Sequence, residues 1–292
     1  MRLGGRESGN VEDRRGRGGI GGRFGGRRIV AGGGLGTVVL VVLALLFGVD
    51  PGMILSGTGP APPPYATEGG GPGGEPAPAD SARTFVARVL AETEDVWNPL
   101  FETIGRDYEE PRLVLYTGVV ESGCGTAQAQ VGPFYCPGDR RVYLDLGFLG
   151  QMQRSLGATG DFAAAYVIAH EVGHHVQNLL GVLARVEALK RNASEAEANA
   201  LHVRVELQAD CLAGLWARRA NEARGILEQG DIEEGLNAAA AVGDDRLQRR
   251  ARGTVQPESF THGSSAQRVR WFRAGLESGR LEACDTFLTD RL

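Results

Sequence analysis

One stretch, DFAAAYVIAHEVGHHVQNLLG at residues 161–181, constrains the fold more than any other part of the chain. Its first half, Ala163 to Ala169, is apolar all round, which is typical of a helix buried in a core. At about 100° per residue, His170 and His174 lie about 40° apart on one helical face, whereas His175 is rotated by about 140° from His170. Buried imidazoles need partners. The stretch therefore predicts a core helix that presents two of its three histidines to one ligand.

A metal ion is the partner that two histidines four residues apart suit best. A catalytic zinc takes three protein ligands and keeps one position open, so a third ligand must come from elsewhere. The segment VELQAD supplies Glu206 and Asp210, again four residues apart on one helical face. We expect Glu206 to complete the ligand set and Asp210 to accept the free ring N–H of one histidine. His202, one turn before Glu206, is the alternative third ligand, and other divalent ions also accept this donor set.

The position of Glu171 predicts a reaction. It lies about 100° round the helix from His170, close enough to contact a water bound to the metal. Zinc activates its bound water and polarises a carbonyl oxygen, while a carboxylate takes the proton and passes it to the leaving amine. We therefore expect one Zn²⁺ per chain and hydrolysis of a peptide or protein substrate, with Glu171 as general base. The alternative is a metal-binding envelope protein that acts as a partner-binding or assembly module with little or no proteolysis.

The N-terminal part of the chain has a different composition from the rest. Residues 29–49 contain no charge and are long enough to cross about 30 Å of hydrocarbon as a helix. Arg27 and Arg28 precede this span and Asp50 follows it, so the positive-inside rule predicts a cytoplasmic N-terminus with the remainder outside. A cleaved signal peptide and a buried core helix are the alternatives.

These features predict a single-pass membrane protein whose catalytic domain lies outside the cytoplasm, which on a bacterial cell membrane would be periplasmic or extracellular. The first 28 residues carry eight Arg, a pattern that suggests nucleic acid or a membrane surface. The apolar span beside them favours the lipid bilayer, and no nucleic-acid partner is expected. The expected parts are a basic cytoplasmic arm (1–28), a transmembrane signal anchor (29–49), a Pro/Gly-rich linker (50–80) and a metallopeptidase domain (81–292).

Periodicity within the last part predicts an α+β fold, mostly helical with a small antiparallel sheet. An amphipathic helix should run from Ser81 to near Gly105, followed by strands at 112–118 and 140–149. The second strand, RRVYLDLGFL, is expected to be an edge strand that pairs with substrate. Further helices are predicted from an Asp161 N-cap to Gly181, from a capping box formed by Ser194 and Glu197 to about Ala220, and after Asp231.

Four cysteines fit an oxidising compartment and favour two disulfides, although three pairings are open. Cys124 with Cys136 would close a loop between two strands. Cys211 with Cys284 would then tie a helix to the C-terminal tail. A four-cysteine zinc site is the rival, but the chain has no C-x-x-C spacing.

Several long motifs together resemble one family. HEVGH followed by ELQAD looks like the gluzincin type of zinc metallopeptidase, and the chain more closely resembles the bacterial putative neutral zinc metallopeptidase family, whose members look like single-pass membrane proteins. The motifs that carry the likeness are RESGNVEDRRG, GCGTAQAQVGPFYCPGDRRVYLDL, AHEVGHHVQ, VELQADCLAGLWA and FTHGSSAQRVRWFRAG.

The resemblance implies a zincin-like fold with His170, His174 and Glu206 as metal ligands and Glu171 as the catalytic residue. FTHGSSAQR is also similar in position to a His-Pro and Arg segment of membrane zinc proteases that cleave prenylated or misfolded proteins. That likeness makes His262 and Arg268 candidate contacts to the substrate or transition state. Gly263 stands where those proteases have Pro.

Overall fold

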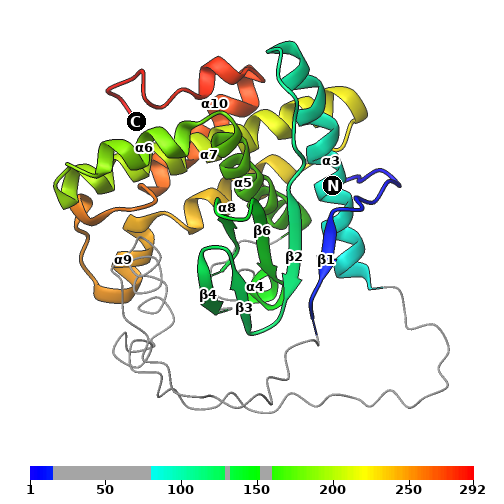
Figure 1. Cartoon of the computed structure of the whole chain (residues 1–292), viewed down its shortest axis with the longest axis horizontal. Helices are drawn as coiled ribbons and strands as arrows, with labels where there is room; N and C mark the ends of the chain where they lie inside the picture. Colours follow the sequence, from blue (N-terminus) through cyan, green and yellow to red (C-terminus); the bar gives the residue numbers. More distant parts are fainter. Residues whose placement is uncertain (16–79, 129–131, 152–159) are drawn as a thin grey trace.

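A computed structural model describes residues 1–15, 80–128, 132–151 and 160–292 of the chain. Two long helices, α5 and α7, pack against each other at its centre, with α3 and a small sheet beside them and with α8 and α10 packed on their other faces (Figure 1). The prediction of a mostly helical α+β chain is confirmed. The helices are α3 (Ser81–Thr103), α4 (Leu146–Gln151), α5 (Asp161–Leu179), α6 (Val182–Lys190), α7 (Glu195–Arg224), α8 (Asp231–Ala241), α9 (Asp244–Arg252) and α10 (Ser265–Ser278), with 3-10 turns η3 (Pro257–Ser259) and η4 (Leu281–Cys284).

The main sheet has the strand order β1-β2-β6-β5. Strand β2 pairs in parallel with both β1 and β6, whereas β5 and β6 are antiparallel. The sheet is therefore mixed, and the predicted antiparallel sheet is wrong. These strands are β1 (Val11–Asp13), β2 (Arg112–Tyr116), β5 (Phe134–Cys136) and β6 (Arg141–Asp145), and a separate antiparallel hairpin is formed by β3 (Val119–Ser122) and β4 (Gly125–Gln128).

The predicted edge strand at 140–149 is also wrong. Strand β6 lies inside the sheet between β2 and β5, and the chain leaves the strand after Asp145 to form α4. The Asp145 carboxylate accepts hydrogen bonds from the backbone N–H groups of Gly118 and Gly147, at 2.9 and 2.7 Å. Those bonds hold the chain in a turn. An Asp side chain that binds nearby backbone N–H groups competes with continued strand pairing, so the strand ends here.

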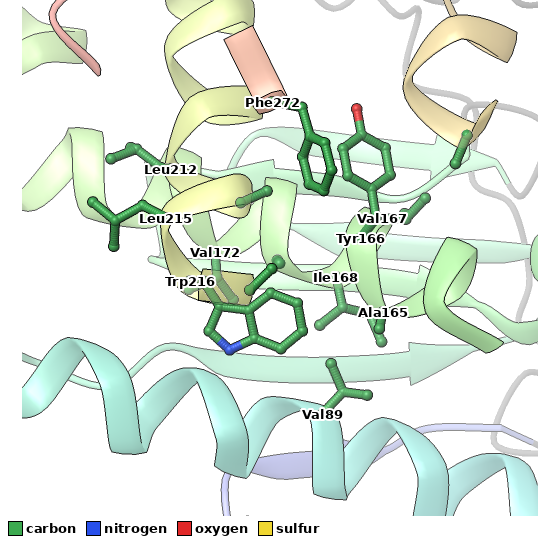
Figure 2. Close-up of a cluster of buried hydrophobic side chains, with 14 of the residues drawn as sticks. Val89, Ala165, Tyr166, Val167, Ile168, Val172, Leu212, Leu215, Trp216 and Phe272 are labelled. Carbon is green, nitrogen blue, oxygen red and sulfur yellow. The ribbon is translucent and has the colours of Figure 1, made fainter. Parts of the chain in front are cut away.

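The core lies between α3, α5 and α7, as Figure 2 shows for Val89, Ile168 and Trp216. All residues from Ala163 to Ala169 are buried, as their uniformly apolar character predicted. Helix α7 begins with the predicted capping box: Ser194 accepts from the N–H of Glu197, whose side chain binds back to Ser194. The helical periodicity therefore placed both central helices, but the predicted N-cap of α5 is wrong: Gly160 occupies that position, and Asp161 is the first residue of the helix.

Helices α7 and α10 approach each other at two glycines. A Cβ on Gly275 would lie 1.9 Å from the carbonyl oxygen of Cys211, and a Cβ on Gly214 would lie 2.0 Å from that of Phe272. No other residue leaves room for backbones this close. A disulfide between Cys211 and Cys284, here called the helix disulfide, joins α7 to η4 just after α10. A second, between Cys124 and Cys136, is called the hairpin disulfide, because it joins the β3–β4 turn to β5.

The first fifteen residues pack against α3 and add β1 to the sheet. Glu94 of α3 is only 1% exposed, and the described residues that donate to its carboxylate all come from this segment. Arg6 donates to its carboxylate at 3.0 Å, Asn10 donates at 3.0 Å, and the Ser8 hydroxyl also donates to it. Since a buried carboxylate without donors is costly, the segment and α3 stabilise each other.

The predicted membrane location, with a cytoplasmic N-terminus and a catalytic domain outside, is wrong. Arg15 and Asp80, at the two ends of the stretch 16–79, form an ion pair, and β1 shares a sheet with β2. A chain that crossed a membrane once between them would place them on opposite sides. Within the ranges described, no helix is long and apolar enough to span a membrane. Residues 29–49, where the spanning helix was predicted, and the linker up to residue 79 lie outside those ranges.

Candidate metal centre

The predicted ligand residues meet where α5 crosses α7. Gly173 faces Ala209 at this crossing, and a Cβ on Gly173 would lie 3.1 Å from the Ala209 carbonyl oxygen. This close approach brings His170 and His174 of α5 against Glu206 of α7. The Nε2 atoms of the two histidines lie 3.3 and 3.6 Å from the Glu206 carboxylate oxygens, and one donor atom from each residue lies within 4.8 Å of the others.

This donor set fits zinc. Zn–N and Zn–O bonds of about 2.0–2.2 Å in a tetrahedral site place the ligand atoms about 3.3–3.6 Å apart. The two His-to-Glu206 distances fall in this range. An imidazole nitrogen that carries a lone pair repels a carboxylate oxygen at such a distance unless a positive charge, from a proton on the ring or from a metal ion, lies between them. The arrangement of His170, His174 and Glu206 is therefore that of residues shaped around a positive charge.

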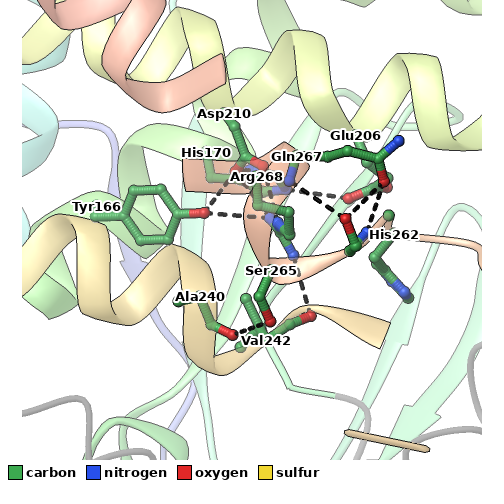
Figure 3. Close-up of polar contacts among 12 residues, drawn as sticks. Tyr166, His170, Glu206, Asp210, Ala240, Val242, His262, Ser265, Gln267 and Arg268 are labelled. Carbon is green, nitrogen blue, oxygen red and sulfur yellow. Dashed lines mark hydrogen bonds and ion pairs between the residues drawn. The ribbon is translucent and has the colours of Figure 1, made fainter. Parts of the chain in front are cut away.

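His170 is oriented by a buried polar network (Figure 3). Its Nδ1 lies 2.9 Å from an Asp210 oxygen, and the Tyr166 hydroxyl donates to the same oxygen. Arg268 of α10 donates to both Asp210 oxygens at 2.8 Å. Because Asp210 accepts, Nδ1 of His170 must carry a proton, which leaves Nε2 as the ring atom that faces Glu206 and that a metal ion would bind.

His174 is oriented by Gln177, a residue that the sequence analysis missed. Its Nδ1 lies 2.9 Å from the Gln177 Oε1. The Gln177 amide group donates to the Val205 carbonyl and to Gln208, at 2.8 and 2.9 Å, so its oxygen is the atom that faces the ring. The signal was available, because Gln177 follows His174 by three residues on one helical face.

The charges of the centre are strongly coupled. Burial acts to lower the pKa of His170, but the carboxylates of Asp210 and Glu206 raise it to about 9. Burial acts to raise the pKa of Glu206, yet the surrounding histidines hold it well below its usual range. Burial likewise opposes ionisation of Asp210, and Arg268 lowers the pKa of that carboxyl. The electrostatic environment therefore favours positive charge between the two helices.

Glu171 differs from every other buried carboxylate in the described ranges. It is 8% exposed, and no described residue forms a hydrogen bond or ion pair with it. The remaining buried carboxylates all have such partners; they are Glu92, Glu94, Asp145, Glu206, Asp210, Asp231 and Asp244. The Glu171 oxygens nevertheless reach solvent, so their lone pairs are free to accept a proton from a water.

Two further histidines lie beside Glu206. His202 Nε2 is 3.6 Å from a Glu206 oxygen, outside the three-residue cluster, and burial lowers the pKa of His202 to about 4. His262, whose ring lies 6.2 Å from that of His202, is held by Asp244. The Asp244 carboxylate accepts from the backbone N–H groups of residues 261 to 263 and lies 3.4 Å from His262 Nδ1. Among the described residues, His262 Nε2 has no partner.

Two predicted placements can now be compared with the structure. His175 lies outside the centre: its Nε2 is 2.6 Å from the Glu109 carbonyl oxygen and its Nδ1 is 3.1 Å from the Tyr135 hydroxyl. Arg268, expected near the substrate, is 3% exposed and is bound to Asp210 and Tyr166. A buried guanidinium with these partners contacts the orienting network instead. The helix disulfide is also close to this network, because its Cys211 follows Asp210.

Comparisons with known proteins identify the family of the chain. No solved structure matches the chain. A protein of Escherichia coli K12, YpfJ, is 49% identical over 286 residues, which cover 97% of this chain and 96% of that protein. A Mycobacterium tuberculosis H37Rv protein, Rv2575, is 43% identical over 261 residues, covering 84% and 85% respectively. Neither name states an activity.

The profile of a family described as putative neutral zinc metallopeptidase matches residues 1–287, and this description implies zinc. The resemblance found in the motifs is thus confirmed, and the chain belongs to the putative neutral zinc metallopeptidase family.

Proposed function

We propose that this protein is a zinc-dependent endopeptidase that holds one zinc ion between α5 and α7. In this proposal His170, His174 and Glu206 bind the ion, and Asp210 and Gln177 orient the two histidines. The family description and the spacing of the three donor residues support it. The substrate is a peptide or protein chain.

The unpaired carboxylate of Glu171 is the observation that carries the catalytic part of the proposal. A general base must have a free lone pair and must lie beside the reacting water. Glu171 directly follows the ligand His170 on α5, and no described residue donates to its carboxylate. The carboxylate oxygens of Glu171 reach solvent and have no described protein partner, so a water can approach them, as the role of general base requires.

When bound, zinc lowers the pKa of a coordinated water and polarises a substrate carbonyl. Glu171 takes the proton of the attacking water and delivers it to the leaving amine, so no covalent acyl-enzyme is needed. In this proposal His262, held by Asp244 and with a free Nε2, donates a hydrogen bond to the developing negative charge on the substrate. Burial acts to lower the pKa of His262, but Asp244 raises it, which favours a ring that carries both protons.

The test compares Glu171→Gln with the intact full-length protein. Both are purified, assayed for zinc content, and incubated with a quenched fluorescent peptide library and with denatured casein. We expect Glu171→Gln to retain zinc and to lose activity by at least about 100-fold, the range for a general base. The matched control is Glu277→Gln, an exposed acid on α10, which should behave like the intact protein.

Two outcomes would contradict the proposal in different ways. A Glu171→Gln protein that cleaves at the original rate excludes Glu171 as the base. A zinc-loaded intact protein that cleaves neither probe contradicts the endopeptidase and leaves a metal-binding module that acts through partners.

A further inference from the structure

Arg268 is a buried cation that forms an ion pair with Asp210. Its side chain is 4% exposed, and that of Asp210 is fully buried. Nε and Nη2 of Arg268 each donate to a different Asp210 oxygen, both at 2.8 Å (Figure 3). This two-bond geometry is the strongest form of an ion pair. The two charges therefore cancel inside the core.

The remaining bonds of Arg268 hold it away from any substrate. Nη2 also donates to the Tyr166 hydroxyl at 3.2 Å, and Nη1 donates to the Val242 carbonyl at 3.4 Å. Nη2 lies 3.4 Å from Nδ1 of His170, and since both atoms carry protons they meet only through the shared Asp210 oxygen. The arginine thus acts on His170 through Asp210.

This pairing changes what Asp210 contributes to the metal centre. A lone carboxylate behind a histidine ligand would add a full negative charge next to the ion. Paired with Arg268, the unit that orients His170 is neutral, as is the Gln177 amide that orients His174. Among the ligand and orienting residues, only Glu206 then keeps an uncancelled charge.

We propose that Arg268 is a positioning residue of the metal centre that clamps Asp210 and cancels its charge, so that His170 is held with Nε2 free while Glu206 alone supplies negative charge. This inference rests on the metal centre of the proposed function. It replaces the substrate contact expected for Arg268 from the sequence.

The decisive experiment is a rescue in the full-length protein. Asp210→Asn removes the carboxylate and leaves the Arg268 charge uncancelled beside the ion. We expect zinc affinity, measured by competition with a chromophoric chelator, to fall by about 100-fold, the upper end for loss of an orienting partner. Adding Arg268→Met removes the stray positive charge, so the double variant should regain about tenfold of that affinity.

The control for this rescue is Asp210→Asn combined with Arg273→Met. Arg273 is an exposed residue of the same helix, so its loss should restore nothing. Circular dichroism of the chelator-treated proteins checks that each variant is folded before metal is added. A double variant that binds zinc no more tightly than Asp210→Asn would overturn the proposal, because a purely structural Arg268 predicts that result.

A second comparison applies if Asp210→Asn does not fold. Arg268→Lys keeps the charge but loses the planar fork, whereas Arg268→Met loses both. With Co²⁺ as a visible probe, the Lys variant should keep more of the original absorption spectrum than the Met variant, and identical spectra in all three proteins would refute the proposal. Metal content of the intact protein is measured first. If that protein binds no metal the centre itself is wrong, whereas binding without rescue is evidence against Arg268 alone.

Discussion

Replacing Gly275 with alanine should uncouple α10 from the metal centre. The new Cβ would lie 1.9 Å from the Cys211 carbonyl oxygen, whereas Cβ atoms essentially never come within 3.0 Å of such a neighbour. The two helices must therefore separate by about 1 Å, the difference between these distances. Arg268 on α10 binds Asp210 on α7 at 2.8 Å, and a further separation of about 1 Å takes these bonds beyond 3.5 Å, where hydrogen bonds are lost.

The free energy of unfolding should fall as well. Alanine gains about 1 kcal/mol over glycine in helix propensity. Overpacking costs about 1–3 kcal/mol or more, and here the cost lies at the upper end because a backbone carbonyl cannot rotate away. A net loss of about 2 kcal/mol is therefore expected.

Urea denaturation of the Gly275→Ala protein after chelation measures this loss, and chelator competition measures zinc affinity. The matched control is Gly5→Ala, since a Cβ on Gly5 would have no neighbour within 4 Å. An unchanged denaturation midpoint together with unchanged zinc affinity would show that the helix contact is not rigid and that the reasoning is wrong.

Three further predictions concern the N-terminal segment, the histidines beside Glu206 and the two disulfides. Deleting residues 1–15 should lower the melting temperature of the apo protein, because Glu94 then has none of its donors; an unchanged melting curve would contradict this. His174→Ala should lower zinc affinity far more than His202→Ala, and equal losses would make His202 a ligand. Mild thiol reductant should open the hairpin disulfide, which has one exposed cysteine, before the helix disulfide, whose cysteines are buried; mass spectrometry after alkylation gives the order.

The residues proposed as ligands could be predicted because the spacing on each helix depends on that helix alone. Four-residue spacing places His170 with His174, and Glu206 with Asp210, on one face of any helix that they occupy. The uniformly apolar run before His170 predicts that this helix is buried, so its polar face must meet another polar face. VELQAD carries a second such face, with Glu206 and Asp210 four residues apart. Local periodicity was therefore sufficient to place these four side chains together.

The partners that orient the site depend on distances between helices, which local periodicity does not contain. Arg268 reaches Asp210 because Gly214 and Gly275 let α7 and α10 touch, and neither glycine forms a motif by itself. The same limit explains the wrong membrane prediction. An apolar run of 21 residues is a local property, whereas the ion pair between Arg15 and Asp80 joins positions 65 residues apart.

The structure also changes which part of the chain must be present in any assay of the site. The sequence placed the start of the catalytic domain at Ser81, and a fragment from that residue would lack β1 and every donor to Glu94. Glu94 belongs to α3, which packs against both α5 and α7, so an uncompensated charge there would disturb the two helices that carry the ligands. A loss of zinc in such a fragment would therefore reflect the missing segment, and the ligand assignments are tested only by substitutions in the full chain.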